Sequence, residues 1–190
     1  MKIEFTRNDL QQKIRITAIG LLNQQLADAL DLGLQAKQAH WNVKGQQFSS
    51  LHELFDRTAE NVEEFSDVIA ERAVQLGGLA EGTVEAIAKA SRLPVYELDL
   101  YRGSDHLRAL SGSLARFAAS AREAIATAAM AGDADTADVF TQVSRATDTL
   151  LWKVAAHIPE AWELPVESPA QATVVPITPQ SIPARRRKAR

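Results

Sequence analysis

Proline is confined almost entirely to one end of this 190-residue chain, which limits where helices can form. Six of the seven prolines lie at or beyond Pro159, whereas all nine glycines lie at or before Gly132. Proline breaks helix interiors, and a proline-rich segment with few apolar residues cannot build a packed core. The distribution predicts a helical domain over residues 1–160 and a disordered tail over residues 161–190.

Apolar residues recur at helical spacing throughout the predicted domain. The pattern predicts long helices over residues 9–43, 47–76, 99–130 and 134–158, with a short helix over residues 83–90. Ser50 and Glu53 predict a capping box at the start of the second long helix. Four long helices with one long middle connection are typical of a ferritin-like bundle. We therefore expect an all-α, ferritin-like four-helix bundle with a short extra helix in the crossover connection.

The composition limits the chemistry and the location of the protein. The chain has no cysteine, which excludes disulfides, thiolate zinc sites and thiol catalysis, so a metal would need nitrogen and oxygen ligands. It has neither a positively charged leader with an apolar core nor an apolar run of membrane-spanning length. We expect a cytoplasmic protein without a membrane partner.

Five potential metal ligands lie within thirty-two residues: His40, His52, Asp56, Asp67 and Glu71. On a helix the last four point to about 0°, 40°, 60° and 100°, so they share one face. Two pairs with i, i+4 spacing result, and each pair could hold one ion. His40 lies on the opposite arm of a predicted hairpin, at a height similar to that of His52.

The distance between the two pairs requires a second subunit. Asp56 and Asp67 are eleven residues apart, which is about 16 Å along a helix. Metal–oxygen distances are about 2 Å, so one ion cannot bind both pairs of one helix. If the shared face packs antiparallel against its symmetry mate, the His52 end of one chain meets the Glu71 end of the other, giving two identical sites per dimer.

Other interpretations of these residues remain open at this point. A carboxylate on a long helix is usually solvated, and Glu60 and Glu63 share the same face, so geometry alone does not select the ligands. A di-iron oxidase inside one bundle would need Glu-x-x-His pairs. None exists, because Lys37, Ser49, Gly103 and Val154 precede the four histidines by three positions. An architectural DNA-compacting protein with an idle metal site is the third alternative.

Several segments resemble the Dps mini-ferritins, the DNA-binding proteins from starved cells. They are residues 37–45 (KQAHWNVKG), His52 with Asp56, residues 70–78 (AERAVQLGG) and the start of the fourth long helix (GDADTAD, residues 132–138). The similarity extends over roughly residues 15–160. It implies a hollow homododecamer that oxidises Fe(II), preferably with hydrogen peroxide, and stores a ferric mineral.

The resemblance also assigns roles to individual residues. It implies a ferroxidase centre at the two-fold dimer interface, with His40, His52 and Asp56 from one subunit and Asp67 and Glu71 from its partner. The nearby Trp41 would intercept stray oxidising equivalents, although a buried interface aromatic is an equally good interpretation. Asp138 and Asp133 would line a three-fold pore, where carboxylates concentrate Fe(II); one acidic residue of that segment is expected to cap the helix.

The basic end of the chain is the candidate DNA-binding segment. It consists of Arg185, Arg186, Arg187, Lys188 and Arg190. Twelve such tips on a dodecamer would bind phosphates without sequence preference, and the protein would then associate with the nucleoid. The alternative is a solubilising or assembly-related extension. Two further histidines match no ligand position: we expect His106 at the surface and His157 near a helix C-terminus.

Overall fold

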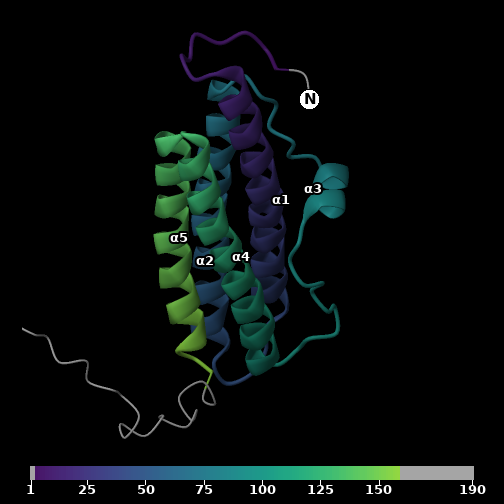
Figure 1. Ribbon diagram of the computed structural model, residues 1–190. Coiled ribbons are helices and arrows are strands. Elements are labelled where there is room, and N and C mark those ends of the chain that lie inside the picture. Colours follow the sequence, from purple (N-terminus) through teal and green to yellow (C-terminus); the bar gives the residue numbers. More distant parts are fainter. Residues whose placement is uncertain (1–2, 159–190) are drawn as a thin grey trace, which may run out of the picture.

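The computed structural model describes residues 3–158, so the predicted tail lies outside the described residues. It contains the four long helices α1 (Gln12–Asn42), α2 (Phe48–Gln75), α4 (Gly103–Ala131) and α5 (Ala134–Ala155), and the short helix α3 (Val84–Ala90). Figure 1 shows the long helices side by side, with α3 outside the bundle next to α1. Residues 3–158 form no strand. The predicted all-α bundle is confirmed.

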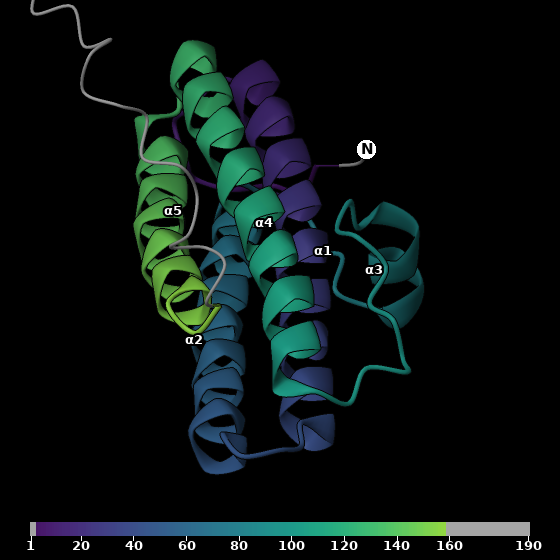
Figure 2. The ribbon, with the colours of Figure 1, turned by 90° about the horizontal axis from the view of Figure 1, so that it is seen from below.

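The connections between helices set their directions. A short turn makes α1 and α2 antiparallel, and another makes α4 and α5 antiparallel, whereas the connection through α3 runs along the bundle and leaves α2 and α4 parallel (Figures 1 and 2). This is the crossover topology that the sequence predicts. None of the described helices is both long enough and apolar enough to span a membrane.

Large apolar side chains from all four long helices fill the centre of the bundle. Those that are fully buried are Ile19, Leu22, Leu32, Leu51, Phe55, Ile69, Leu76, Leu107, Leu110, Leu114, Phe117 and Phe140. They recur at three- and four-residue spacings, so each helix buries one stripe. This single core holds the outer faces of α1 and α2 in fixed positions.

Helix ends differ from the sequence prediction in a few places. The helix α1 begins at Gln12 rather than residue 9, α4 begins at Gly103 rather than residue 99, and α5 ends at Ala155 rather than residue 158. The turn after α4 depends on Gly132, whose φ of 91° lies in the left-handed region and whose N–H bonds to the carbonyls that end the helix.

The predicted capping box at the start of α2 is wrong. The helix already begins at Phe48, so Ser50 lies inside its first turn and donates its hydroxyl to the carbonyl of Gln47. Glu53 instead accepts a bond of 2.5 Å from Arg57 one turn later. Glu53 therefore has a local structural partner, though not the expected one.

Polar side chains of α1 attach the crossover to the bundle. The buried carboxylate of Asp28 accepts bonds from the backbone N–H of Arg92 at 2.8 Å and from its guanidinium at 2.6 and 3.1 Å. Gln35 donates to the carbonyl of Pro94 at 3.1 Å. Buried polar groups need such partners. These hydrogen bonds add to the packing of Leu93 and Tyr96 against the core, whereas α3 itself buries no residue fully.

The prediction that His106 lies at the surface is also wrong. His106 is only 1% exposed, its Nδ1 lies 2.7 Å from the hydroxyl of Tyr96, and its ring meets Phe55 edge-on. The residue occupies the inner face of α4 because its neighbours Leu107 and Leu110 continue the buried stripe. His157, by contrast, is exposed just after α5, with Nδ1 2.9 Å from the carbonyl of Lys153, as expected.

Candidate metal centre

The turn between α1 and α2 brings the two predicted histidine ligands into contact. His40 lies in the last turn of α1 and His52 in the second turn of α2. Gly45 makes the tight connection feasible, because its φ of 116° lies in the left-handed region that favours glycine. The two imidazoles stack with ring centroids 3.7 Å apart.

Each imidazole is oriented by the backbone of the other residue. The Nδ1 of His40 lies 2.8 Å from the carbonyl oxygen of His52, and the Nδ1 of His52 lies 2.8 Å from the carbonyl oxygen of His40. A carbonyl can only accept, so each Nδ1 carries the proton and donates it. The lone pair of each Nε2 is then free for a metal ion, the arrangement that orients histidine ligands in metal sites.

Asp56, the third predicted ligand, lies beside the two histidines and accepts a hydrogen bond from a lysine. Its Oδ1 lies 3.8 Å from Nδ1 of His40 and accepts a hydrogen bond of 2.5 Å from Nζ of Lys37. This hydrogen bond lowers the pKa of Asp56, with the two nearby histidines acting in the same direction. The carboxylate is therefore ionised and available as a ligand at neutral pH.

The other two predicted ligands lie farther along α2. Asp67 and Glu71 are exposed, and within residues 3–158 neither makes a hydrogen bond or an ion pair. Because α2 is continuous from Phe48 to Gln75, eleven residues place Asp56 and Asp67 about 16 Å apart. No three histidine, aspartate or glutamate side chains of the described chain could hold one ion together. The five predicted ligands thus lie in two separate groups in one chain, which we call half-sites after the predicted centre.

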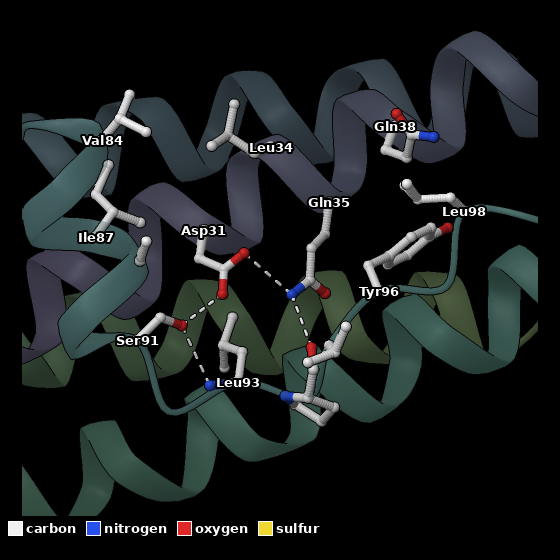
Figure 3. Close-up of a pocket in the computed structure, with 13 residues that line it drawn as sticks. Asp31, Leu34, Gln35, Gln38, Val84, Ile87, Ser91, Leu93, Tyr96 and Leu98 are labelled. Atoms are coloured by element: carbon white, nitrogen blue, oxygen red, sulfur yellow. Dashed lines mark hydrogen bonds between the residues drawn. The ribbon is translucent and has the colours of Figure 1, made fainter.

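The surface between the half-sites is apolar and grooved. A hollow of about 330 Å³ between α1, α2 and α3 is lined mainly by apolar side chains, including Leu34, Val62 and Ile87. A second hollow of about 470 Å³ lies between α1 and the crossover, where Leu34, Val84 and Leu98 surround the bonded side chains of Asp31 and Gln35 (Figure 3).

Trp41 lies in the last turn of α1, on the side of the helix that faces away from the core. Its side chain is 67% exposed, directly beside His40 in the chain. Within residues 3–158 it is therefore not a buried aromatic. Its assignment as a scavenger of oxidising equivalents stays a prediction.

The two predicted pore residues have different environments. Asp133 is buried at the N-cap of α5, where it accepts a bond from the backbone N–H of Thr136 and pairs with the guanidinium of Arg72 at 2.9 Å. In the single subunit its carboxylate is thus buried and bonded within the fold, and its assignment to the pore stays a prediction. Asp138 is exposed one turn into α5 and remains a pore candidate.

Two residues near the half-sites were not predicted from the sequence. Lys37 had no predicted role at the site, although its position three residues before His40 places it on the same face of α1. Arg72 follows Glu71 and holds the end of α2 against the start of α5. Helical periodicity could have found Lys37, but the long-range partner of Arg72 required the fold.

Comparisons with known proteins agree with the fold of this chain. The model of the ferritin-like domain matches residues 19–161. A DNA protection during starvation protein of Agrobacterium fabrum is 45% identical over 160 residues, which cover 84% of this chain and 99% of that protein. A tetragonal crystal form of Mycobacterium smegmatis Dps is 30% identical, with a TM-score of 0.77 over 82% of this chain and 94% of that one. DpsC from Streptomyces coelicolor is 28% identical, with a TM-score of 0.79 over 82% and 91%.

Proposed function

Because this chain belongs to the Dps family of ferritin-like proteins, we propose that it is a ferroxidase that oxidises Fe(II) and stores the ferric product. Hydrogen peroxide is the preferred oxidant, and the ferric mineral collects inside a hollow homododecamer. The name of the Agrobacterium relative states DNA protection during starvation. Consuming Fe(II) and peroxide together removes the two reagents that generate hydroxyl radical, which accounts for such protection chemically.

The observation that carries this proposal is the separation of the five predicted ligands into two groups, one where α1 and α2 meet and one farther along α2. A two-fold axis through the apolar surface between them would bring His40, His52 and Asp56 of one subunit to Asp67 and Glu71 of the partner subunit. The free Nε2 atoms and the carboxylates form a nitrogen and oxygen ligand set that suits iron. Because two iron ions share these five protein groups, each ion keeps coordination positions open for peroxide.

The proposed reaction balances without a radical product. Two Fe(II) ions each give one electron to one hydrogen peroxide, whose O–O bond breaks. With two water molecules the products are two FeOOH units of the mineral and four protons. The exposed carboxylate of Asp138 near the start of α5 would attract Fe(II) toward the cavity.

Anaerobic loading of the full-length protein with Fe(II), followed by one peroxide per two irons, tests the proposal. We expect a rapid rise in ferric absorbance that His52→Ala or Asp67→Ala slows by about tenfold or more, since even groups that only support a ligand are worth about 10–100-fold. Asp148→Ala on α5, which removes an exposed partner of Arg122, serves as the control. Unchanged rates in both ligand variants would contradict the site.

We also propose that the basic C-terminal residues Arg185–Arg190 bind DNA. Five cations in the last six residues contrast with an acidic remainder of the chain, and twelve copies would add weak phosphate contacts together. A gel shift at low salt compares the full chain with one that ends at Pro183. Equal retardation of DNA by the two proteins would refute the proposal. Binding would place this cytoplasmic protein at the nucleoid.

A further inference from the structure

A lysine lies where a metal ion would compete with it. Nζ of Lys37 lies 2.5 Å from Oδ1 of Asp56, and the two side chains are 39% and 34% exposed. Lys37 comes from α1, three residues before His40, whereas Asp56 comes from α2, four residues after His52. Lys37 and His40 on α1 therefore face His52 and Asp56 on α2 across the hairpin. The ammonium belongs to the same half-site as the three predicted ligands.

This contact has a direct electrostatic consequence for a bound cation. The five predicted ligands bring three negative charges to one shared site, and the lysine cancels one of them. It also occupies a lone pair of Asp56 that a metal ion would otherwise use. A cation held within a few ångströms of an ammonium is repelled, and partial exposure reduces the repulsion without removing it.

Lys37 has other acidic residues nearby that could receive its charge. Glu60 and Glu63 follow Asp56 at four- and seven-residue spacing on α2, and both act electrostatically on Lys37. Lys37 and Glu63 line the same hollow between α1, α2 and α3. The ammonium can therefore leave Asp56 and keep an acidic partner, which lowers the cost of displacing it.

We propose that Lys37 is a positioning residue that weakens divalent-metal binding by competing for Asp56, so that ions exchange at the half-site instead of remaining there. On binding, the contact between Nζ of Lys37 and Oδ1 of Asp56 breaks, a metal–carboxylate bond forms, and the ammonium keeps its proton and turns toward Glu63. The inference rests on the proposed function, because it needs Asp56 to be a metal ligand. The proposed function states which residues bind the ions, whereas this inference states how tightly the ions are bound.

The experiment measures Co(II) binding to the full-length protein, with affinity from titration and coordination from visible absorption. We expect Lys37→Gln to bind Co(II) about fivefold to tenfold more tightly, a size in keeping with a partly exposed ion pair plus relief of repulsion. Lys37→Arg, which keeps the charge, should match the wild-type protein. Lys44→Gln is the matched control, since Lys44 is exposed and lies over the ring of Tyr101.

The following results would overturn the inference. Equal affinity of Lys37→Gln and wild-type protein would show that the lysine does not compete, and weaker binding by Lys37→Gln would show that it supports Asp56 as a ligand. If His52→Ala also binds Co(II) normally, the proposed site fails and the inference fails with it. Loss of binding in His52→Ala together with unchanged binding in Lys37→Gln would refute only the role of Lys37. Thermal unfolding of each variant confirms that the fold is retained.

Discussion

His40 and His52 hold each other in place: their rings stack at 3.7 Å, and each Nδ1 lies 2.8 Å from the carbonyl oxygen of the other residue. The paired bonds connect the end of α1 to the start of α2. They fix both ring orientations before any ion binds, which reduces the reorganisation that binding requires. The ligand geometry is therefore a property of the helical hairpin itself.

A mixture of two inactive variants should recover activity if the half-sites join across subunits. His52→Ala and Asp67→Ala each damage both sites of their own homodimer. In a mixed dimer, the intact His52 of one subunit meets the intact Asp67 of the other, so one of two sites is complete. Random pairing makes half of the dimers mixed, so co-expressed variants should show about a quarter of the wild-type ferroxidase rate.

A matched pair of variants controls this experiment. His52→Ala with Asp56→Ala changes two residues of the same half-site, so no mixed dimer has a complete site and activity should stay low. Recovery in this control pair, or no recovery in the first pair when mixed oligomers are present, would refute the shared site. Differently tagged copies, purified in sequence, establish that mixed oligomers have formed.

The buried ion pair between Arg72 and Asp133 should contribute strongly to stability. Asp133→Ala leaves the buried guanidinium without its partner and removes the cap of α5, so we expect a loss of about 3–5 kcal/mol in the free energy of unfolding. Asp135→Ala is the control, because that side chain is 85% exposed and lies 3.8 Å from Arg72, farther than Asp133. This variant should lose less than about 1 kcal/mol of unfolding free energy. Urea unfolding at fixed protein concentration compares them.

The burial of His106 should make stability depend on pH. Burial lowers the pKa of His106 in the folded protein, while the charge of Asp105 opposes the shift. The unfolded chain then binds the proton more readily, so stability is fully present above about pH 6.5 and falls as the pH drops below that value. The stability difference between wild-type protein and His106→Gln should shrink from pH 7.5 to pH 5. His157→Gln controls for the loss of an exposed histidine, and a constant difference for His106→Gln would contradict the prediction.

The contact between Asp28 and Arg92 should determine how tightly the crossover is held. Arg92→Met removes two guanidinium bonds from a buried carboxylate, and bonds to charged groups contribute about 1.5–3 kcal/mol. We expect faster amide hydrogen exchange and faster proteolysis in residues 91–96, with little change in the four long helices. Lys89→Met, a nearby exposed position, is the control. Equal exchange rates in the two variants would show that other bonds hold the segment.

The helices and the separation of the ligands could be predicted because both depend on local periodicity. Apolar spacing located all five helices to within about four residues. The interval between Asp56 and Asp67 on one helix keeps both carboxylates from binding one ion, since the rise per residue is constant. The failed capping box at Ser50 and Glu53 shows the limit of such reasoning, because one added turn before it changes the role of every residue in the motif.

What the sequence by itself determined is the fold class and the separation of the five predicted ligands into two groups along the chain. Only the tertiary structure decided which residues surround them. The contacts of Lys37 with Asp56 and of Arg72 with Asp133 each join two helices, and the burial of His106 depends on Tyr96 of the crossover and Phe55 of α2. Such contacts depend on how the helices pack and rotate against one another, and helical periodicity carries no information about the residue on the facing helix.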